Sequence, residues 1–373
     1  MSSSQPPLRD SYEGMYNRAL ALTRSGDIEG SIGLFRRLTS RLANLPDSIL
    51  RRRPELGDLH QQARLQLTSL LSSEGRYAEA IEVAQVLLDT HPGEARRWRR
   101  ELAVLRCAKG EESGLEELQA LAEESPGEPE AWLLLGTENR LAGRFADSRK
   151  ALDKALTLCQ ENNGEDCADV YYQQFLLFKE MKQMDDALAA WEAAESHNPE
   201  IGSTVRQVYE LLTQAGRYSD ALRYVARDAN RLQAGFQQGL IASLTGRSLE
   251  AREEWRQVAG LDPNEYQYGH DAWVEAVLRL GNPDPALEWL QDSLPRVGTP
   301  RLLVLSGIGW AMRKDAELAG LLFQQAINMQ RRQRPPKTKL DSTDWQLLDS
   351  LVKDEEVKTA LKPYFAVIAT LWG

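Results

Sequence analysis

The sequence predicts an all-α fold, a right-handed solenoid (superhelix) of antiparallel helix pairs that ends in a C-terminal helical cap. The first observation is a recurring turn. Gly-Arg follows an amphipathic segment, and a small residue stands five positions after the glycine, as in Gly75 to Ala80 and Gly143 to Ser148. The second is spacing, because Gly75 and Gly143 lie 68 residues apart, or two periods of about 34 residues. Such periods are typical of helical repeat arrays, which stack helix pairs into one continuous core and present binding surfaces.

Each repeat is expected to contain two helices separated by the glycine turn, and the segment 132–155 shows both most clearly. Trp132, Leu135 and Gly136 fall at i, i+3 and i+4, on one face of a helix. Gly143 ends that helix, because glycine enters the left-handed conformation at little cost. The inward face of the second helix consists of Phe145, Ser148, Leu152 and Ala155. Small residues on these faces let the two helices cross closely.

Nine units are expected, with irregular connections at 44–57 and 161–166. They begin near Ser11, Leu59, Ala95, Glu128, Ala168, Gly202, Leu232, Gln267 and Pro300. The expected organisation is a flexible N-terminus at 1–10, repeats over 11–331, a basic proline-containing linker at 332–341 and capping helices over 342–373. Terminal repeats leave an apolar face open, and an apolar tail is expected to cover it around Phe323 and Ala326. The tail residues expected to do so are Val367, Ile368, Leu371 and Trp372.

The repeated residues resemble the tetratricopeptide repeat, whose units combine a bulky residue, Leu-Gly, a Gly-aromatic turn, an alanine, an aromatic residue and a terminal proline. Matching residues in the second half of the chain are Met184, Ala187, Trp191, Ala194, Pro199, Gly239, Gly246, Ala251, Trp255 and Pro263. The resemblance covers roughly residues 11–331. It implies that the first helix of each unit lines a concave surface on which another protein binds.

The composition predicts a soluble, cytoplasmic protein without membrane insertion. The chain is 42% apolar and 27% charged, lacks a run of 18 apolar residues, and has no visible signal peptide. Its net charge of −10 argues against non-specific binding to nucleic acid. Cys107, Cys159 and Cys167 lack a CxxC spacing, so reduced thiols are the simplest interpretation, with pairing of Cys159 and Cys167 left open.

The sequence gives no sign of catalytic, cofactor-binding or metal-binding residues, and no enzyme activity or cofactor is expected. None of the four histidines lies three or four residues from another histidine or a cysteine, so zinc-ligand spacings are missing. Nucleophile-elbow and phosphate-binding glycine motifs are also missing. The polar segment 161–166 lacks the acidic ladder of a calcium loop.

The sequence places a basic cluster on the first helices of units three to six, although the chain is acidic overall. Its members are Arg96, Arg99, Arg100, Arg106, Arg140, Lys179 and Arg206. Guanidinium groups bind carboxylates in bidentate fashion, so these residues are the candidate partner-binding residues of the concave face. The alternative is that they form ion pairs with Glu and Asp of neighbouring helices.

We therefore expect a non-catalytic scaffold or adaptor that binds an extended or helical segment of another protein, with an acidic segment as the sharper hypothesis. One alternative is a regulatory or sensor array that acts on a transcription regulator or signalling partner. Another is an RNA-binding helical repeat, against which the acidic charge argues. Self-association into homo-oligomers is left open.

Overall fold

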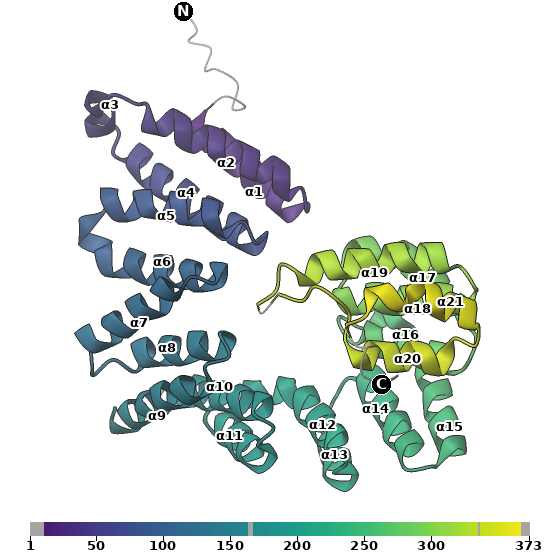
Figure 1. Ribbon diagram of the computed structural model, residues 1–373. Coiled ribbons are helices and arrows are strands. Elements are labelled where there is room, and N and C mark those ends of the chain that lie inside the picture. The colour runs from purple at the N-terminus through teal and green to yellow at the C-terminus, as the bar shows by residue number, and fades with distance from the viewer. Residues whose placement is uncertain (1–10, 163–166, 335, 367–373) are drawn as a thin grey trace, which may run out of the picture. The chain divides into compact units, whose positions relative to one another are not determined.

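The computed structural model describes residues 11–162, 167–334 and 336–366, and within this part the chain is all-α, as predicted (Figure 1). The chain divides into two compact units, unit 1 (Met1–Glu161) and unit 2 (Asn162–Gly373). The division falls in the polar insertion noted in the sequence. The N-terminal segment 1–10 and the tail 367–373 lie outside the described residues, so the roles predicted for them stay predictions.

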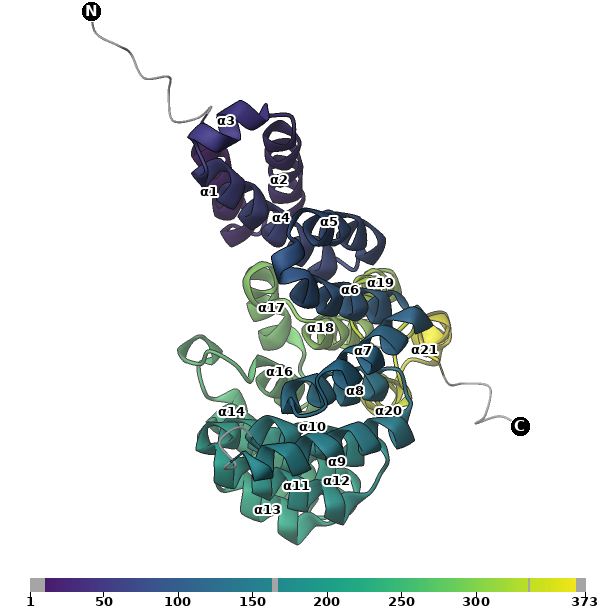
Figure 2. The ribbon, with the colours of Figure 1, turned by 90° about the vertical axis from the view of Figure 1, so that its left-hand side faces the viewer.

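Unit 1 consists of helix pairs that follow one another in chain order (Figure 2). The short α3 (Asp47–Arg52) lies in the predicted extra connection, and a 3₁₀ turn (Pro92–Glu94) precedes α6. The pairs are α1 (Tyr12–Arg24) with α2 (Ile28–Ala43), α4 (Glu55–Ser73) with α5 (Tyr77–Thr90), α6 (Ala95–Lys109) with α7 (Glu112–Glu124), and α8 (Pro129–Leu141) with α9 (Phe145–Glu161).

Unit 2 continues the same arrangement and ends in two short helices, α20 (Ser342–Leu351) and α21 (Glu355–Leu361). Its pairs are α10 (Cys167–Glu180) with α11 (Met184–His197), α12 (Val205–Gln214) with α13 (Tyr218–Val225), α14 (Arg231–Leu244) with α15 (Ser248–Ala259), α16 (His270–Arg279) with α17 (Asp284–Val297), and α18 (Pro300–Met312) with α19 (Ala316–Gln330). Its 3₁₀ turns are Pro199–Thr204, Pro263–Glu265 and Lys362–Tyr364. The pairs of both units begin close to the predicted unit starts.

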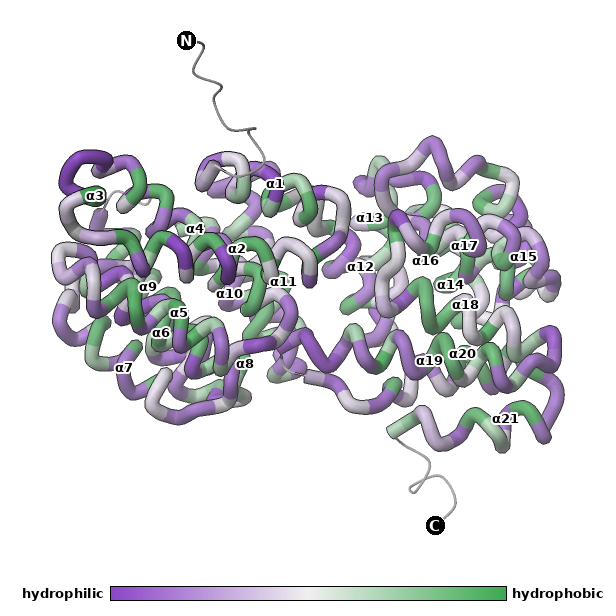
Figure 3. The backbone as a smooth tube through the Cα atoms, turned by 90° about the horizontal axis from the view of Figure 1, so that it is seen from above, coloured by the Kyte–Doolittle hydropathy of each residue, from purple (hydrophilic) through white to green (hydrophobic). Residues whose placement is uncertain are grey.

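The core lies between the helices, because each helix turns one apolar face inward. Hydrophobic and hydrophilic stretches accordingly alternate within single helices (Figure 3). Trp98 in unit 1 and Trp191 and Phe323 in unit 2 are almost fully buried. Burying one such side chain stabilises the fold by about 1.5–3 kcal/mol.

Every one of these pairs turns through a residue in the left-handed conformation. Seven of these residues are glycines: Gly26, Gly75, Gly110, Gly143, Gly216, Gly246 and Gly281. The other two are Lys182, at φ 60° between α10 and α11, and Lys314, at φ 68° between α18 and α19. A side chain in this conformation costs roughly 1–2 kcal/mol, so packing of the flanking helices offsets strain at both lysines.

The arginine of the recurring Gly-Arg turn connects successive repeats. Each of three such arginines reaches an acidic residue in the first turn of the preceding repeat's second helix. The nitrogen–oxygen distances are 3.2 Å for Arg76 to Glu29, 2.5 Å for Arg144 to Glu112 and 2.6 Å for Arg217 to Asp185. Exposed pairs of this kind contribute about 0.2–1 kcal/mol each. The sequence motif therefore encodes both a turn and a bridge between repeats.

The C-terminal segment as far as Ala366 covers the last repeat, and the tail residues named above lie outside the described residues. Phe365 is 3% exposed, and its ring centre lies 5.4 Å from that of Phe323 and 5.2 Å from that of Trp345. Tyr364 also contacts Phe323, at 6.0 Å between ring centres. Backbone N–H groups of Leu340 and Ala366 pair the linker with this segment, at 3.0 and 2.9 Å from the carbonyls of Tyr364 and Leu340.

The cysteines differ from the expectation of three reduced thiols. Cys107 is not part of a disulfide, whereas Cys159 and Cys167 are disulfide-bonded. Both bonded cysteines are buried, at 3% and 0% exposure. Sequence spacing alone does not report this, because it says nothing of the approach of two side chains.

The close crossing of α6 and α7 leaves no room for a side chain at Gly114 of α7, which can be tested. A Cβ there would lie 2.6 Å from the carbonyl oxygen of Ala103 and 2.6 Å from the backbone nitrogen of Cys107. Gly114→Ala should therefore lower the free energy of unfolding by about 1–3 kcal/mol, because backbone atoms do not yield easily. Gly33→Ala is the matched control, since Gly33 lies inside α2 with no atom near its added Cβ. It should stabilise the protein by up to about 1 kcal/mol. Urea unfolding followed by tryptophan fluorescence measures both, and equal effects would contradict the close crossing.

Candidate functional site

The structure places the seven predicted basic residues in different environments. Arg96, Arg99, Arg100 and Arg106 lie on α6 and Arg140 on α8, all in unit 1, whereas Lys179 on α10 and Arg206 on α12 belong to unit 2. Only the four residues of α6 therefore share one element. Whether they bind a partner stays a prediction.

Ion pairs occupy two of the arginines on α6. Arg96 binds Glu128 in bidentate fashion, with nitrogen–oxygen distances of 2.7 and 2.6 Å. Arg99 bonds Glu117 at 2.6 Å and Glu124 at 2.8 and 3.0 Å. Hydrogen bonds to Glu124 and Glu117 raise the pKa of Arg99 above its usual value. Both arginines thus connect α6 to α7 and to the start of α8.

Arg100 and Arg106 differ, because neither forms an ion pair with any described residue. Arg100 is exposed and borders a cavity of about 220 Å³ between α6, α7 and α8. The wall of this cavity is formed by Arg96, Arg97, Arg100, Leu118, Leu121, Glu128, Glu130, Ala131 and Leu134. Arg96 and Arg97 are paired with Glu128 and Glu94, so among the arginines of this wall Arg100 is the one without an ion pair to a described residue, and it lies over an apolar floor. We call this site the α6 cavity.

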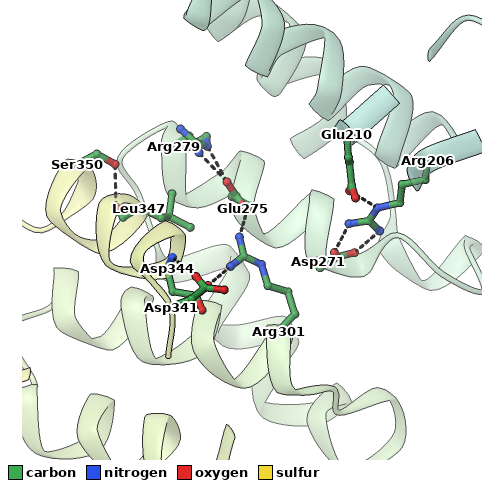
Figure 4. Close-up of polar contacts among 10 residues, drawn as sticks. All are labelled: Arg206, Glu210, Asp271, Glu275, Arg279, Arg301, Asp341, Asp344, Leu347 and Ser350. Atoms are coloured by element: carbon green, nitrogen blue, oxygen red, sulfur yellow. Dashed lines mark hydrogen bonds and ion pairs between the residues drawn. The ribbon is translucent and has the colours of Figure 1, made fainter. Parts of the chain in front are cut away.

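The remaining predicted residues are less available to bind a partner. Arg140 is buried, at 8% exposure. Lys179 lies over the ring of Phe175, 5.8 Å from its centre, with its Nζ 3.5 Å from Oε1 of Gln207. Arg206 belongs to an ion network of unit 2 (Figure 4).

This ion network joins the first helices of several repeats in unit 2 (Figure 4). Arg206 of α12 bonds Asp271 of α16 at 3.2 and 2.6 Å and Glu210 at 2.7 Å. One turn further along α16, Glu275 accepts hydrogen bonds from Arg279 at 2.7 Å and from Arg301 of α18 at 2.6 Å. Arg301 also bonds Asp344 of α20, at 2.5 Å. The network therefore ties α12, α16, α18 and α20 together.

Burial and charge compete within the network. Burial opposes the charge of Asp271, but the hydrogen bond and the charge of Arg206 outweigh it and lower the pKa of Asp271. Burial raises the pKa of Asp344 and outweighs the charge of Arg301. Glu275 is the most buried carboxylate of the network, with a side chain 9% exposed. Charges this deep require partners, because an unpaired ion in the interior is costly.

Sequence reasoning missed this network apart from Arg206. A signal was present, because Arg301 stands alone in α18, whose other residues from Pro300 to Met312 are uncharged. A helix that is apolar on all sides is buried, and a lone cation on it calls for a buried carboxylate.

The carboxylates and guanidinium groups of these ion pairs neutralise each other, and the pairs themselves provide no reactive group. The described residues contain no group of three or more His, Cys, Asp or Glu side chains that could hold a metal ion. No helix in the described part is long and apolar enough to cross a membrane.

Residues 112–163, from α7 through α9, match the family model of the tetratricopeptide repeat. This segment is therefore identified as a tetratricopeptide repeat. No curated protein matches the sequence.

Several solved structures are similar to the chain. A tetratricopeptide repeat protein from Parabacteroides merdae is 16% identical with a TM-score of 0.42, over 68% of this chain and 95% of that one. PilF of Pseudomonas aeruginosa is 16% identical with a TM-score of 0.36, over 60% and 96%. Yeast Tom70 is 13% identical with a TM-score of 0.48, over 95% and 83%. Similarity at this level says nothing about ligands.

The ion network predicts a strong dependence of stability on Glu275. Glu275→Ala leaves Arg279 and Arg301 without their shared carboxylate and should lower the free energy of unfolding by about 1.5–3 kcal/mol. Glu250→Ala is the matched control, because Glu250 forms an exposed pair with Arg247 on α15 and should cost less than about 1 kcal/mol. Urea unfolding at low and high salt measures both. A loss at Glu275 no larger than at Glu250 would mean that the network contributes little.

Proposed function

We propose that the protein is a non-catalytic scaffold that binds an extended or helical segment of another protein, and that α6 attracts acidic side chains of that segment. Tetratricopeptide repeat arrays generally serve as protein-interaction scaffolds. The described residues offer paired charges and a cleft with an apolar floor, which suit binding. The acidic-ligand part of this proposal rests on Arg100. This residue is an exposed cation on the wall of the α6 cavity and has no ion-pair partner in the described chain.

The apolar floor and the charged wall of the α6 cavity suit different parts of one segment. Leu118, Leu121 and Leu134 offer contacts to an apolar side chain, whereas Arg100 offers a bidentate partner to a carboxylate. Arg106 stands in the last turn of the same helix and adds to the positive potential. Arg96 and Arg99 contribute less, because glutamates already compensate them.

This assignment changes which substitutions test the hypothesis. Reversing Arg99 would break its pairs with Glu117 and Glu124, and changing Arg140 would disturb a buried side chain, so folding and binding would be confounded. Arg100→Glu combined with Arg106→Glu avoids both problems. Arg231→Glu combined with Arg252→Glu is the control, because both arginines are exposed, lie in unit 2 and form no ion pair with a described residue.

The measurement is fluorescence polarisation with two peptide pools, one acidic and one of the same length and apolar content without charges. Wild-type protein should bind the acidic pool more tightly, and binding should weaken with salt, since the Debye length falls from about 10 Å at 0.1 M to about 3 Å at 1 M. The Arg100/Arg106 variant should lose about tenfold in affinity for acidic peptides, or about 1.4 kcal/mol, and the control variant should lose little. An equal effect of both variants would contradict an acidic ligand on α6.

A further inference from the structure

A second cavity, within unit 2, lies beside the start of α16 and has a volume of about 430 Å³. Its wall includes Arg206 of α12, Gln233 of α14, Tyr268 and Gly269 before α16, and Val297 and Leu302 around the start of α18. We call it the α16 cavity. It is separate from the α6 cavity, which belongs to unit 1.

Gln233 is the feature that calls for a ligand. The residue is 7% exposed, yet its side-chain amide forms no hydrogen bond with any described residue. The only hydrogen bond from Gln233 to a side chain is that of its backbone N–H, which donates to Oδ1 of Asn230 at 3.1 Å. The polar side-chain atoms of Gln233 are not fully buried, so solvent in the cavity reaches them where no described residue does. The amide borders the cavity, so a partner for it would lie there.

The backbone at the start of α16 adds donors to the same wall. Gly269 is the N-cap, at φ 90°, and it provides no side chain to cap the helix. No described group accepts from the backbone N–H groups of His270 and Asp271, whereas those of Ala272 and Trp273 donate to the carbonyl of Gly269. Free N–H groups at a helix start are ready hydrogen-bond donors.

The loop that carries these donors is held in place. Asn230 caps α14 through its Oδ1, and its Nδ2 donates to the carbonyl of Tyr268 at 2.8 Å. A Cβ on Gly269 would lie 2.9 Å from this Oδ1, so the loop requires glycine there for space as well as for its φ. The wall is therefore preorganised rather than formed on demand.

The charges of the α16 cavity compensate each other. Arg206 is bonded in bidentate fashion by Asp271 and also by Glu210. His270 donates from Nε2 to the carbonyl of Tyr266 at 3.0 Å and stacks on Trp289. A charged ligand would meet the like charge of either Arg206 or Asp271, so the cavity suits an uncharged polar group.

The rest of the wall is apolar. Val297 and Leu302 line the cavity, and Tyr268 lies at its edge with 56% of its surface exposed. An exposed aromatic ring next to a polar cleft is suited to cover an apolar side chain. The cavity thus pairs hydrogen-bonding groups with an apolar surface.

We propose that the α16 cavity binds a short, uncharged, extended peptide segment of a partner protein, in which one peptide unit bonds the amide of Gln233 and a carbonyl accepts from the start of α16. This proposal rests on the proposed scaffold function and gives that function a second, chemically distinct site. A side-chain amide carries one donor group and one acceptor in the same plane, which matches the N–H and C=O of an extended backbone. An apolar side chain of the same segment packs against Tyr268 and Leu302.

The test uses the full-length chain and a pool of labelled, N-acetylated and C-amidated peptides built from Gly, Ala, Ser, Val and Leu. Gln233→Leu removes the amide and keeps the volume, so it should lower affinity for these peptides at least tenfold. Because no described residue bonds this amide, its removal should not lower the unfolding midpoint. Tyr268→Ala should weaken the same peptides severalfold without unfolding the protein. Gln257→Leu, at an exposed position of α15, is the matched control and should change neither.

Salt and the α6 variants separate this proposal from the scaffold function itself. Affinity for uncharged peptides should stay constant between 0.1 and 1 M salt and should be unaffected by Arg100→Glu combined with Arg106→Glu. If wild-type protein binds only acidic peptides, the α16 proposal is wrong and the scaffold function stands. Binding of uncharged peptides that survives Gln233→Leu also overturns the α16 site. If neither peptide pool binds, both proposals fail.

Discussion

The close approach of two helix backbones is the constraint on which the rest of the structure depends. In three repeats a glycine of the first helix meets a large side chain of the second. A Cβ on Gly136 would lie 2.7 Å from Leu152, one on Gly239 2.5 Å from Trp255, and one on Gly307 2.5 Å from Phe323. The two partners are sixteen residues apart each time, which is the distance that the left-handed turn sets. Without a Cβ the large side chain fills the space itself, and the repeat keeps its core with few residues.

Apolar packing holds the two helices of one repeat together, whereas charged residues connect one repeat to the next. Bridges such as Arg144 to Glu112 lie at the surface and repeat with the turn motif. The network around Glu275 is buried and links α16, α18 and α20 within unit 2. Such compensated charges fix the positions of helices relative to each other, and they leave little net charge for a ligand. Two groups without such partners therefore remain for a ligand. The Arg100 guanidinium has no ion pair, and the Gln233 side-chain amide has no hydrogen bond, with a described residue.

The fold could be predicted from the sequence because its information is local and repeated. The turns, the close helix crossings and the helix starts are each specified by a few neighbouring residues. The same pattern recurs along the chain and can therefore be recognised. The candidate site could be predicted only in part. Arg100 was identified by type and position, but the same reasoning treated Arg96 and Arg99 as its equals. Their carboxylate partners Glu128 and Glu124 come from neighbouring elements, and the choice among several nearby glutamates depends on side-chain geometry.

The sequence by itself determined the helix pairs and their turns, because hydrophobic period and glycine placement act over a few residues. Tertiary structure alone decided which charges are compensated. Arg206 and Asp271 lie on α12 and α16, with α13, α14 and α15 between them in sequence, and Gln233 lines the α16 cavity only because several helix starts converge there. Hydrogen bonding and burial depend on distances of a few ångströms between such elements, and no local pattern in the sequence specifies those distances.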